Sequence, residues 1–215
     1  MQEQAIAELE MGVWSAAPVP APMEDFRARY GATGNQLRGW LVYPLRDGRG
    51  GLLGFEARNL QKKEVTQYKL PRAFWNPVFI GLHRAMPKLW DGSDVWIGEG
   101  LFDMGALEHI VPEQDAVMAA LTAKINQSHI KFLSRFVRGT VHLVFDRDEK
   151  GRKAAIGYID EETGKEKWGA IKSMVRVGIR CRDVSYRCPP GCKDPGDIWE
   201  RGGDVGLRMA FRHSI

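Results

Sequence analysis

The feature that most constrains the fold of this chain is a short apolar segment that runs directly into two acidic residues. Residues 142–155 read HLVFDRDEKGRKAA, so Asp146 and Asp148 follow a strand-like stretch. Alternate side chains of an extended segment point to the same side, which would place the two carboxylates next to each other. Two like charges at such a short distance repel each other unless a proton, a Lys or Arg side chain, or a metal ion lies between them. The segment therefore predicts a buried strand that ends in a charged site.

Strand patterns and helix patterns alternate in the second half of the chain. The expected strands cover residues 94–100, 115–121, 140–146 and 182–186, and the expected helices cover residues 101–110, 126–137 and 169–179. Such alternation with short loops predicts an α/β fold with a parallel sheet. Ligands of such sheets bind at the carboxyl ends of the strands. Glu99 and Asp146, which each end a strand, are therefore expected at the same edge.

The first half of the chain has a different composition. Residues 27–88 contain twelve Lys and Arg residues but only three acidic ones, whereas the whole chain has a net charge of only +4. Residues 39–60 contain two strand patterns around a Gly-rich turn, which is typical of a hairpin, and a third strand is expected near residues 65–70. A basic segment with interleaved aromatic residues favours contact with a polyanion. A solvated basic surface over an aromatic core is the alternative.

Length and composition narrow the class of protein and suggest a domain organisation. The 215 residues contain no apolar run near the ~20 residues of a membrane span. Three cysteines and a polar N-terminus without a signal-peptide pattern predict a cytoplasmic protein with no membrane partner. We expect a tail and Pro/Ala linker at 1–25, a smaller basic α+β subdomain at 26–92, and the parallel-sheet domain at 93–215. The CPPGC segment (188–192) is interpreted as ordinary thiols, and no zinc is predicted.

Two acidic segments together resemble a known family. EGLFD (99–103) follows one expected strand and DRDEKG (146–151) follows a later one, and this pair resembles the Toprim domain. Toprim domains occur in bacterial and phage primases, type IA and II topoisomerases and some nucleases. The resemblance implies that the Glu and the paired Asp bind Mg²⁺, with Mn²⁺ as an alternative, and act in phosphodiester chemistry. Oxygen-only ligands agree with such a hard cation.

Three further segments resemble the catalytic core of bacterial-type DNA primases. They are residues 42–60 and 68–85, which are similar to the stretches before the Toprim domain, and KDPGDIWERGG (193–203), which is similar to a late acidic motif. The resemblance covers about residues 26–210. It implies template-directed synthesis of RNA primers by Mg²⁺-dependent nucleotidyl transfer. Single-stranded DNA and NTPs would be the ligands, and a replicative helicase or another replication protein is a candidate partner.

The resemblance assigns expected roles to individual residues of this chain. The expected metal ligands are Glu99, Asp146, Asp148, Asp194 and Asp197. The first three are also the expected catalytic residues. Asp103 is expected to lie beside the metal ligands without binding the metal itself. The residues expected to bind template and triphosphate are Arg46, Arg58, Lys62, Lys63, Lys69 and Arg72. Simpler roles stay open: Asp148 could only cap a helix, Asp194 could only open a turn, and the basic residues could only be solvated.

The sequence also departs from the primase pattern. Gly196 stands where the late motif usually has its second Asp, Thr122 stands where a Gly is expected, and residues 157–168 look like an insertion. A core without a zinc-binding or helicase domain would fit a phage, a plasmid or another mobile element. Two other functions remain open. A Toprim nuclease would use the same ions on the same type of bond, and a non-catalytic DNA-binding module would carry a degenerate site.

Overall fold

The computed structural model describes residues 12–13, 40–59, 61–62, 64–69, 77–121, 124–184 and 188–212. The chain divides into two compact units, one of residues 1–45 and 52–75 and the other of residues 46–51 and 76–215. The predicted tail and linker at 1–25 lie outside the described residues, except for residues 12–13. Thr122 also lies outside them. Within the described residues, none of the helices has the length and apolar character needed to cross a membrane.

The first unit contains an antiparallel sheet. Its strands are β1 (Gly12–Val13), β2 (Leu41–Arg46), β3 (Leu52–Asn59) and β4 (Glu64–Lys69), in the spatial order β1-β2-β3-β4. The buried residues of β2 and β3 are mainly apolar, which is why these segments form a sheet that covers a core. The expected hairpin at residues 39–60 and the third strand after it are confirmed.

The turn between β2 and β3 is closed by one aspartate. Asp47 Oδ1 accepts hydrogen bonds from the backbone N–H groups of Arg49, at 2.9 Å, and Gly51, at 2.8 Å. Gly50 has a positive φ of 83°, a conformation that favours glycine. The Asp and Gly residues of this segment therefore fix the hairpin, as the sequence predicted.

The second unit is built on a four-stranded parallel sheet. Its strands are β5 (Val95–Gly98), β6 (Ala116–Ala119), β7 (Val141–Val144) and β10 (Cys181–Asp183), in the order β10-β7-β5-β6. All residues of β5, β6 and β7 are buried. Strands covered on both faces explain the continuous apolar segments that predicted them. The predicted α/β class with a parallel sheet flanked by helices is confirmed.

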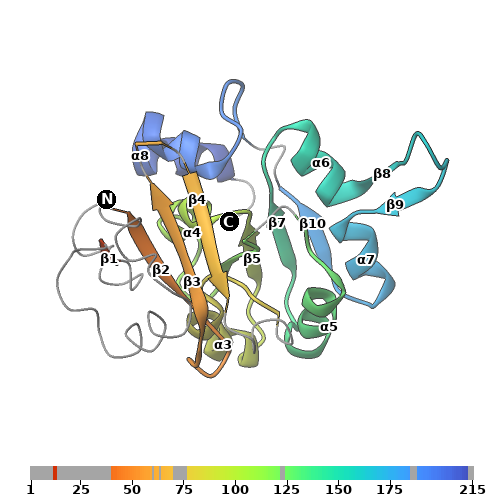
Figure 1. The fold of residues 1–215 in the computed structure, drawn as a ribbon, viewed down its shortest axis with the longest axis horizontal. Coiled ribbons are helices and arrows are strands. Elements are labelled where there is room, and N and C mark those ends of the chain that lie inside the picture. Colours follow the sequence, from red (N-terminus) through yellow and green to blue (C-terminus); the bar gives the residue numbers. More distant parts are fainter. Residues whose placement is uncertain are drawn as a thin grey trace. The chain divides into compact units, whose positions relative to one another are not determined.

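Helices before, between and after the strands cover this sheet (Figure 1). They are α3 (Leu82–Trp90), α4 (Leu101–Glu108), α5 (Gln127–Phe136), α6 (Glu149–Ile156), α7 (Ala170–Arg176) and α8 (Pro195–Phe211). The core between sheet and helices is apolar, with Phe79, Leu133 and Met174 among its fully buried side chains. Helices α4 and α8 also pack on each other, and the ring of His109 stacks on that of Trp199 at 5.4 Å.

The segment interpreted as an insertion forms a separate hairpin. Strands β8 (Gly157–Ile159) and β9 (Glu166–Trp168) pair only with each other in the described structure and extend beyond α6 and α7 (Figure 1). A side chain at Gly157 would lie 2.4 Å from the carbonyl oxygen of Lys167, and φ there is 94°. This glycine therefore lets the chain leave α6 directly into the hairpin.

Candidate metal centre

Two expected site residues meet at the carboxyl edge of the parallel sheet. Glu99 follows β5 and Asp146 lies two residues after β7, and these strands are neighbours in register. The backbone N–H of Asp146 donates a hydrogen bond to Glu99 Oε1 at 3.0 Å. Neighbouring parallel strands thus bring residues 47 positions apart in the chain into contact. The expectation that both acids lie at one edge is confirmed.

Asp148 lies at the start of the helix that follows this edge. It is the N-cap of α6, and its Oδ1 accepts a hydrogen bond from the N–H of Gly151 at 2.8 Å. A side chain at Gly151 would lie only 2.1 Å from the carbonyl oxygen of Asp146, so glycine lets the helix begin against the acidic loop. Asp148 has the capping role that was one of its two interpretations. Its charge nevertheless raises the pKa of Glu99, so it also lies close to the site.

Asp103 is a buried acid beneath the same edge. It lies in the first turn of α4 with only 7% of its surface exposed, and its Oδ2 accepts a hydrogen bond from the N–H of Gly100 at 2.9 Å. Burial and the nearby charge of Asp194 raise the pKa of Asp103 to about 7. A side chain at Gly98 would come within 2.7 Å of Asp103 Cβ, so this glycine allows the close approach. Asp103 is therefore not an acid of the helix surface.

The late acidic segment, at the start of α8, also lies at this cluster of acids. Asp194 is the N-cap of α8, and its Oδ1 accepts a hydrogen bond from the N–H of Asp197 at 2.7 Å. Asp197 is directed back along the chain, and its Oδ2 accepts a hydrogen bond from the N–H of Lys193 at 3.1 Å. These two bonds fix the first turn of α8. Asp197 thus has a capping interaction. That it also binds metal stays a prediction.

A lysine that the sequence analysis did not single out lies between two of the acids. Lys193 Nζ is 3.2 Å from Asp146 Oδ2 and also 3.2 Å from Asp194 Oδ2. The partial burial of Lys193 lowers its pKa, but its hydrogen bonds to Asp194 and Asp146 outweigh this and leave the pKa raised. The sequence does show a Lys immediately before the Asp-Pro segment. The direction of its side chain, however, depends on tertiary contacts that a linear pattern does not contain.

The remaining charges of the cluster are only partly compensated. Burial, together with the charge of Asp146, raises the pKa of Glu99. Burial also raises the pKa of Asp146, although the hydrogen bond from Lys193 acts in the opposite direction. Carboxyls with raised pKa values gain from any further cation that approaches them. Such perturbation in a cluster of acids at a sheet edge is typical of a functional site.

The donor chemistry fits a hard divalent cation. Glu99, Asp146 and Asp194 offer carboxylate oxygens, which Mg²⁺ and Mn²⁺ prefer, and an ammonium group already occupies a cation position between two of them. In the part of the chain that the structure describes, however, no three His, Cys, Asp or Glu side chains are placed to hold one metal ion together. A bound metal would therefore require side chains of this cluster to rearrange.

Gly196 lies where an additional acid would face the cluster. A Cβ built on Gly196 would lie 3.2 Å from Asp194 Oδ1 and 3.8 Å from Asp103 Oδ1. The departure from the primase pattern thus removes a side chain that would point at the acids. Asp197 at the next position points to the backbone of Lys193 instead.

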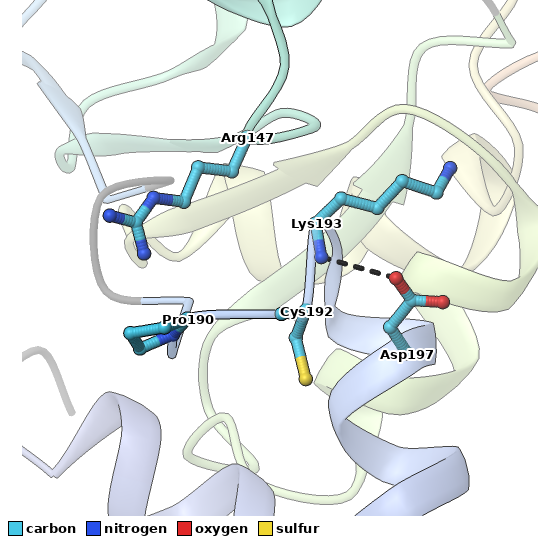
Figure 2. A pocket seen from close by; sticks show the side chains of 6 residues that line it. Arg147, Pro190, Cys192, Lys193 and Asp197 are labelled. Atoms are coloured by element: carbon cyan, nitrogen blue, oxygen red, sulfur yellow. Dashed lines mark hydrogen bonds between the residues drawn. The ribbon is translucent and has the colours of Figure 1, made fainter.

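An open cavity of about 470 Å³ adjoins the late acidic segment (Figure 2). Arg147, Asp197 and residues 190–193 line it. Arg147 donates a backbone hydrogen bond to the carbonyl oxygen of Lys193 at 2.6 Å, which connects the loop after β7 to the loop before α8. Cys192 is a buried free thiol at this cavity, and burial raises the pKa of the nearby Cys188 thiol to about 12. Both loops that carry the acids therefore border the same opening.

The predicted template-binding residues are placed in different surroundings. Arg46 Nη1 donates a hydrogen bond to the carbonyl oxygen of Gly50 at 3.0 Å, which supports the β2–β3 turn. Arg58 pairs with the buried Glu56 at 3.2 Å, so part of its charge is compensated. Lys62 is exposed. Of these, Lys62 is the one whose described surroundings agree best with a solvated, ligand-accessible cation.

The other three basic residues lie partly or wholly outside the described residues. Lys69 is the last residue of β4, but its side chain lies outside the described part of the structure. Lys63 and Arg72 lie outside the described residues altogether. Their proposed role in binding template and triphosphate stays a prediction.

Comparisons with known proteins agree with this fold. Residues 96–198 match the family model described as Toprim-like. A DNA primase of Deinococcus radiodurans is 27% identical over 180 residues, which cover 82% of this chain but 28% of that protein. A DNA primase of Mycobacterium bovis is 29% identical over 213 residues, which cover 94% of this chain and 29% of that protein. The chain thus spans less than a third of the length of these curated relatives.

A solved structure shows the same architecture. The structure titled as the DnaG catalytic core superposes with a TM-score of 0.68 at 18% identity, and the match covers 99% of this chain and 69% of that one. At this identity the likeness shows the fold alone. Residues 96–198 are similar to the Toprim-like family. The chain as a whole has the fold of the catalytic core of bacterial DNA primases, and the resemblance expected from its motifs is confirmed.

Proposed function

We propose that this chain is the catalytic core of a DNA primase, which synthesises RNA primers on single-stranded DNA by nucleotidyl transfer. The observation that carries the proposal is the contact of Glu99 with Asp146 at the carboxyl edge of a Toprim-like sheet. Likeness to DNA primases over 82% of the chain supports this reaction over other Toprim reactions. Single-stranded DNA and NTPs are the proposed ligands, and another replication protein such as a helicase is the proposed partner.

The acids would hold a divalent cation, with Mg²⁺ the first choice and Mn²⁺ the alternative. Glu99 and Asp146 are the proposed central ligands, Asp148 and Asp194 would complete the oxygen set, and Asp197 stays a candidate. When bound, such a cation polarises the α-phosphate and lowers the pKa of the attacking 3′-hydroxyl. A bound cation would also offset the burial and the repulsion between acids that raise the pKa values of Glu99 and Asp146.

The chain's own residues would orient the reacting groups. The 3′-hydroxyl of the growing primer would attack the α-phosphate of the incoming NTP, and the bond to the leaving pyrophosphate would break. The N–H of Asp146 and the N–H of Gly100 hold the carboxylates of Glu99 and Asp103 in the metal-free protein, and the other acids of the cluster would rearrange to complete the site. Exposed cations such as Lys62 would contact template phosphates mainly through charge.

A Toprim nuclease is the second candidate, because the same acids would serve a reaction in which water attacks the phosphodiester. The basic antiparallel segment before the Toprim-like domain favours the primase. The two candidates make opposite predictions for the length of a nucleic acid. Incubation of the protein with unlabelled single-stranded DNA, labelled NTPs and Mg²⁺ should yield labelled oligomers on a denaturing gel. Shortening of end-labelled DNA without incorporation of NTPs would favour the nuclease, and neither product would overturn both.

A further inference from the structure

Lys193 holds the position of a cation inside the acidic cluster. Its Nζ lies 3.2 Å from one oxygen of Asp146 and 3.2 Å from one oxygen of Asp194. These acids come from different loops, one after β7 and one before α8. The ammonium group thus connects the carboxylates of the two loops.

The backbone of Lys193 is held by two hydrogen bonds, and its side chain ends in the two ion pairs. Its N–H donates to Asp197 Oδ2 at 3.1 Å, and its carbonyl oxygen accepts from the N–H of Arg147 at 2.6 Å. The side chain, by contrast, is 56% exposed and borders the open cavity (Figure 2). A flexible stem on a fixed backbone can carry its charge from the carboxylates to solvent without disturbing either loop.

We propose that Lys193 is an internal counterion that joins Asp146 to Asp194 in the metal-free protein and is displaced when a divalent cation binds there. The proposal rests on the metal site of the proposed function. Lys193 is a positioning residue in this account: it keeps the two acids in one place and competes with the metal for the same oxygens.

Competition follows from the geometry of the contacts. A metal ion bound by Asp146 Oδ2 and Asp194 Oδ2 would occupy the space where Nζ now lies, because both oxygens point to that group. Two cations cannot share these oxygens without repelling each other. Lys193 therefore lowers the affinity for metal and, in return, stabilises the protein when no metal is present. Because solvent screens this exposed lysine, both effects should be modest.

The variant Lys193→Met tests both effects, since Met keeps an unbranched side chain but removes the charge. We expect Mg²⁺ to bind about fivefold more tightly in a calorimetric titration without nucleotide or DNA. We also expect the melting temperature in EDTA to fall, because the acids then repel each other without compensation. Lys193→Arg should stay near the wild type in both measurements. Lys172→Met is the matched control, because Lys172 is paired with Glu166 near the β8–β9 hairpin instead.

Unchanged or weaker Mg²⁺ binding by Lys193→Met would overturn the proposal, and so would an unchanged or higher melting temperature in EDTA. A wild-type protein that binds no divalent cation would overturn it together with the metal site. If the wild type binds Mg²⁺ and Lys193→Met binds it more tightly but neither incorporates NTPs, the inference stands and the proposed reaction fails. The titration and the primer assay thus separate the two claims.

Discussion

The acidic residues at the two ends of the parallel sheet have opposite surroundings. At the amino end, Asp94 Oδ1 accepts the N–H of Thr140 at 2.6 Å, and Asp94 Oδ2 lies 3.0 Å from His142 Nε2. The ring of His142 in turn stacks on Trp96 at 4.3 Å. At the carboxyl end, Glu99 and Asp146 contact each other through one backbone hydrogen bond, and other acids surround them.

This difference appears in the pKa values. Burial acts to raise the pKa of Asp94, but the hydrogen bonds from Thr140 and His142 outweigh it, so the pKa is lowered. Burial raises the pKa values of Glu99 and Asp146, and nearby acids add to the effect. Asp94 is thus satisfied by the protein itself, whereas the acids at the other end are arranged to gain from an added cation. The amino end thus stabilises the fold, and we propose that the carboxyl end binds a cation.

The largest effect is expected from Glu99→Gln. The amide oxygen of Gln can still accept the N–H of Asp146, so the fold should persist, but the ligand charge is lost. Primer synthesis should fall by about 10³-fold, because a misplaced metal forfeits several kcal/mol of transition-state stabilisation. The exposed Glu113→Gln provides a matched control. Synthesis by Glu99→Gln within a few-fold of the wild type would show that this acid is not a catalytic ligand.

The next effect concerns the amino end, where Asp94→Ala should reduce stability. The substitution leaves the buried His142 and the N–H of Thr140 without the carboxylate that they now contact. We expect the free energy of unfolding, measured by urea denaturation, to fall by about 2–3 kcal/mol. Glu99→Gln should change it by less than about 1 kcal/mol. Equal losses in the two variants would remove the distinction between the two ends.

A smaller effect is expected from pH. Because the pKa of Asp103 is raised to about 7, the folded protein keeps a proton that the unfolded chain releases near pH 4. Its contribution to stability is therefore full at low pH and is lost as pH rises through about 7, and Glu99 and Asp146 act in the same direction.

In EDTA, the free energy of unfolding should thus decrease by about 1 kcal/mol between pH 6 and pH 8 because of Asp103 alone. Asp103→Asn keeps an oxygen for the N–H of Gly100 and should flatten this dependence. Urea denaturation at several pH values measures it. The same pH dependence in the wild type and in Asp103→Asn would contradict the raised pKa of Asp103.

The smallest effect is expected from Gly196→Asp, which restores the acid missing from the primase pattern. The new carboxylate would begin near Asp194 and Asp103. We expect Mg²⁺ to bind a few-fold more tightly and the melting temperature in EDTA to fall, because one more acid joins the cluster. Gly196→Asn tests the role of charge in the same position. Weaker Mg²⁺ binding by Gly196→Asp would show that position 196 does not face the metal.

The carboxyl end could be largely predicted from the sequence, because its signal is local. An apolar strand followed at once by Glu99 or by Asp146 places an acid at a strand end, and parallel topology then brings those ends together. The positions of β5 and β7 also follow from mostly apolar segments. A pattern of this kind depends on neighbours in the chain, which the sequence shows directly.

The contacts of individual side chains could not be predicted in the same way. Lys193 reaches Asp146 across 47 positions of sequence, and no linear pattern gives its direction. The resemblance predicts that Arg58 contacts template or triphosphate, but Arg58 pairs with the buried Glu56 on its own strand. Residue types and spacing thus predict where acids gather, whereas the cations that compensate them depend on packing.

A calorimetric titration of Mg²⁺ tests most directly the claim that the carboxyl end binds a divalent cation and the amino end does not. The wild type, Asp146→Asn and Asp94→Asn would be compared at a temperature where all three are folded. The account predicts that Asp146→Asn weakens binding by at least about tenfold, whereas Asp94→Asn leaves it unchanged. Equal affinity in the wild type and Asp146→Asn would contradict the account, as would equal weakening in the two variants.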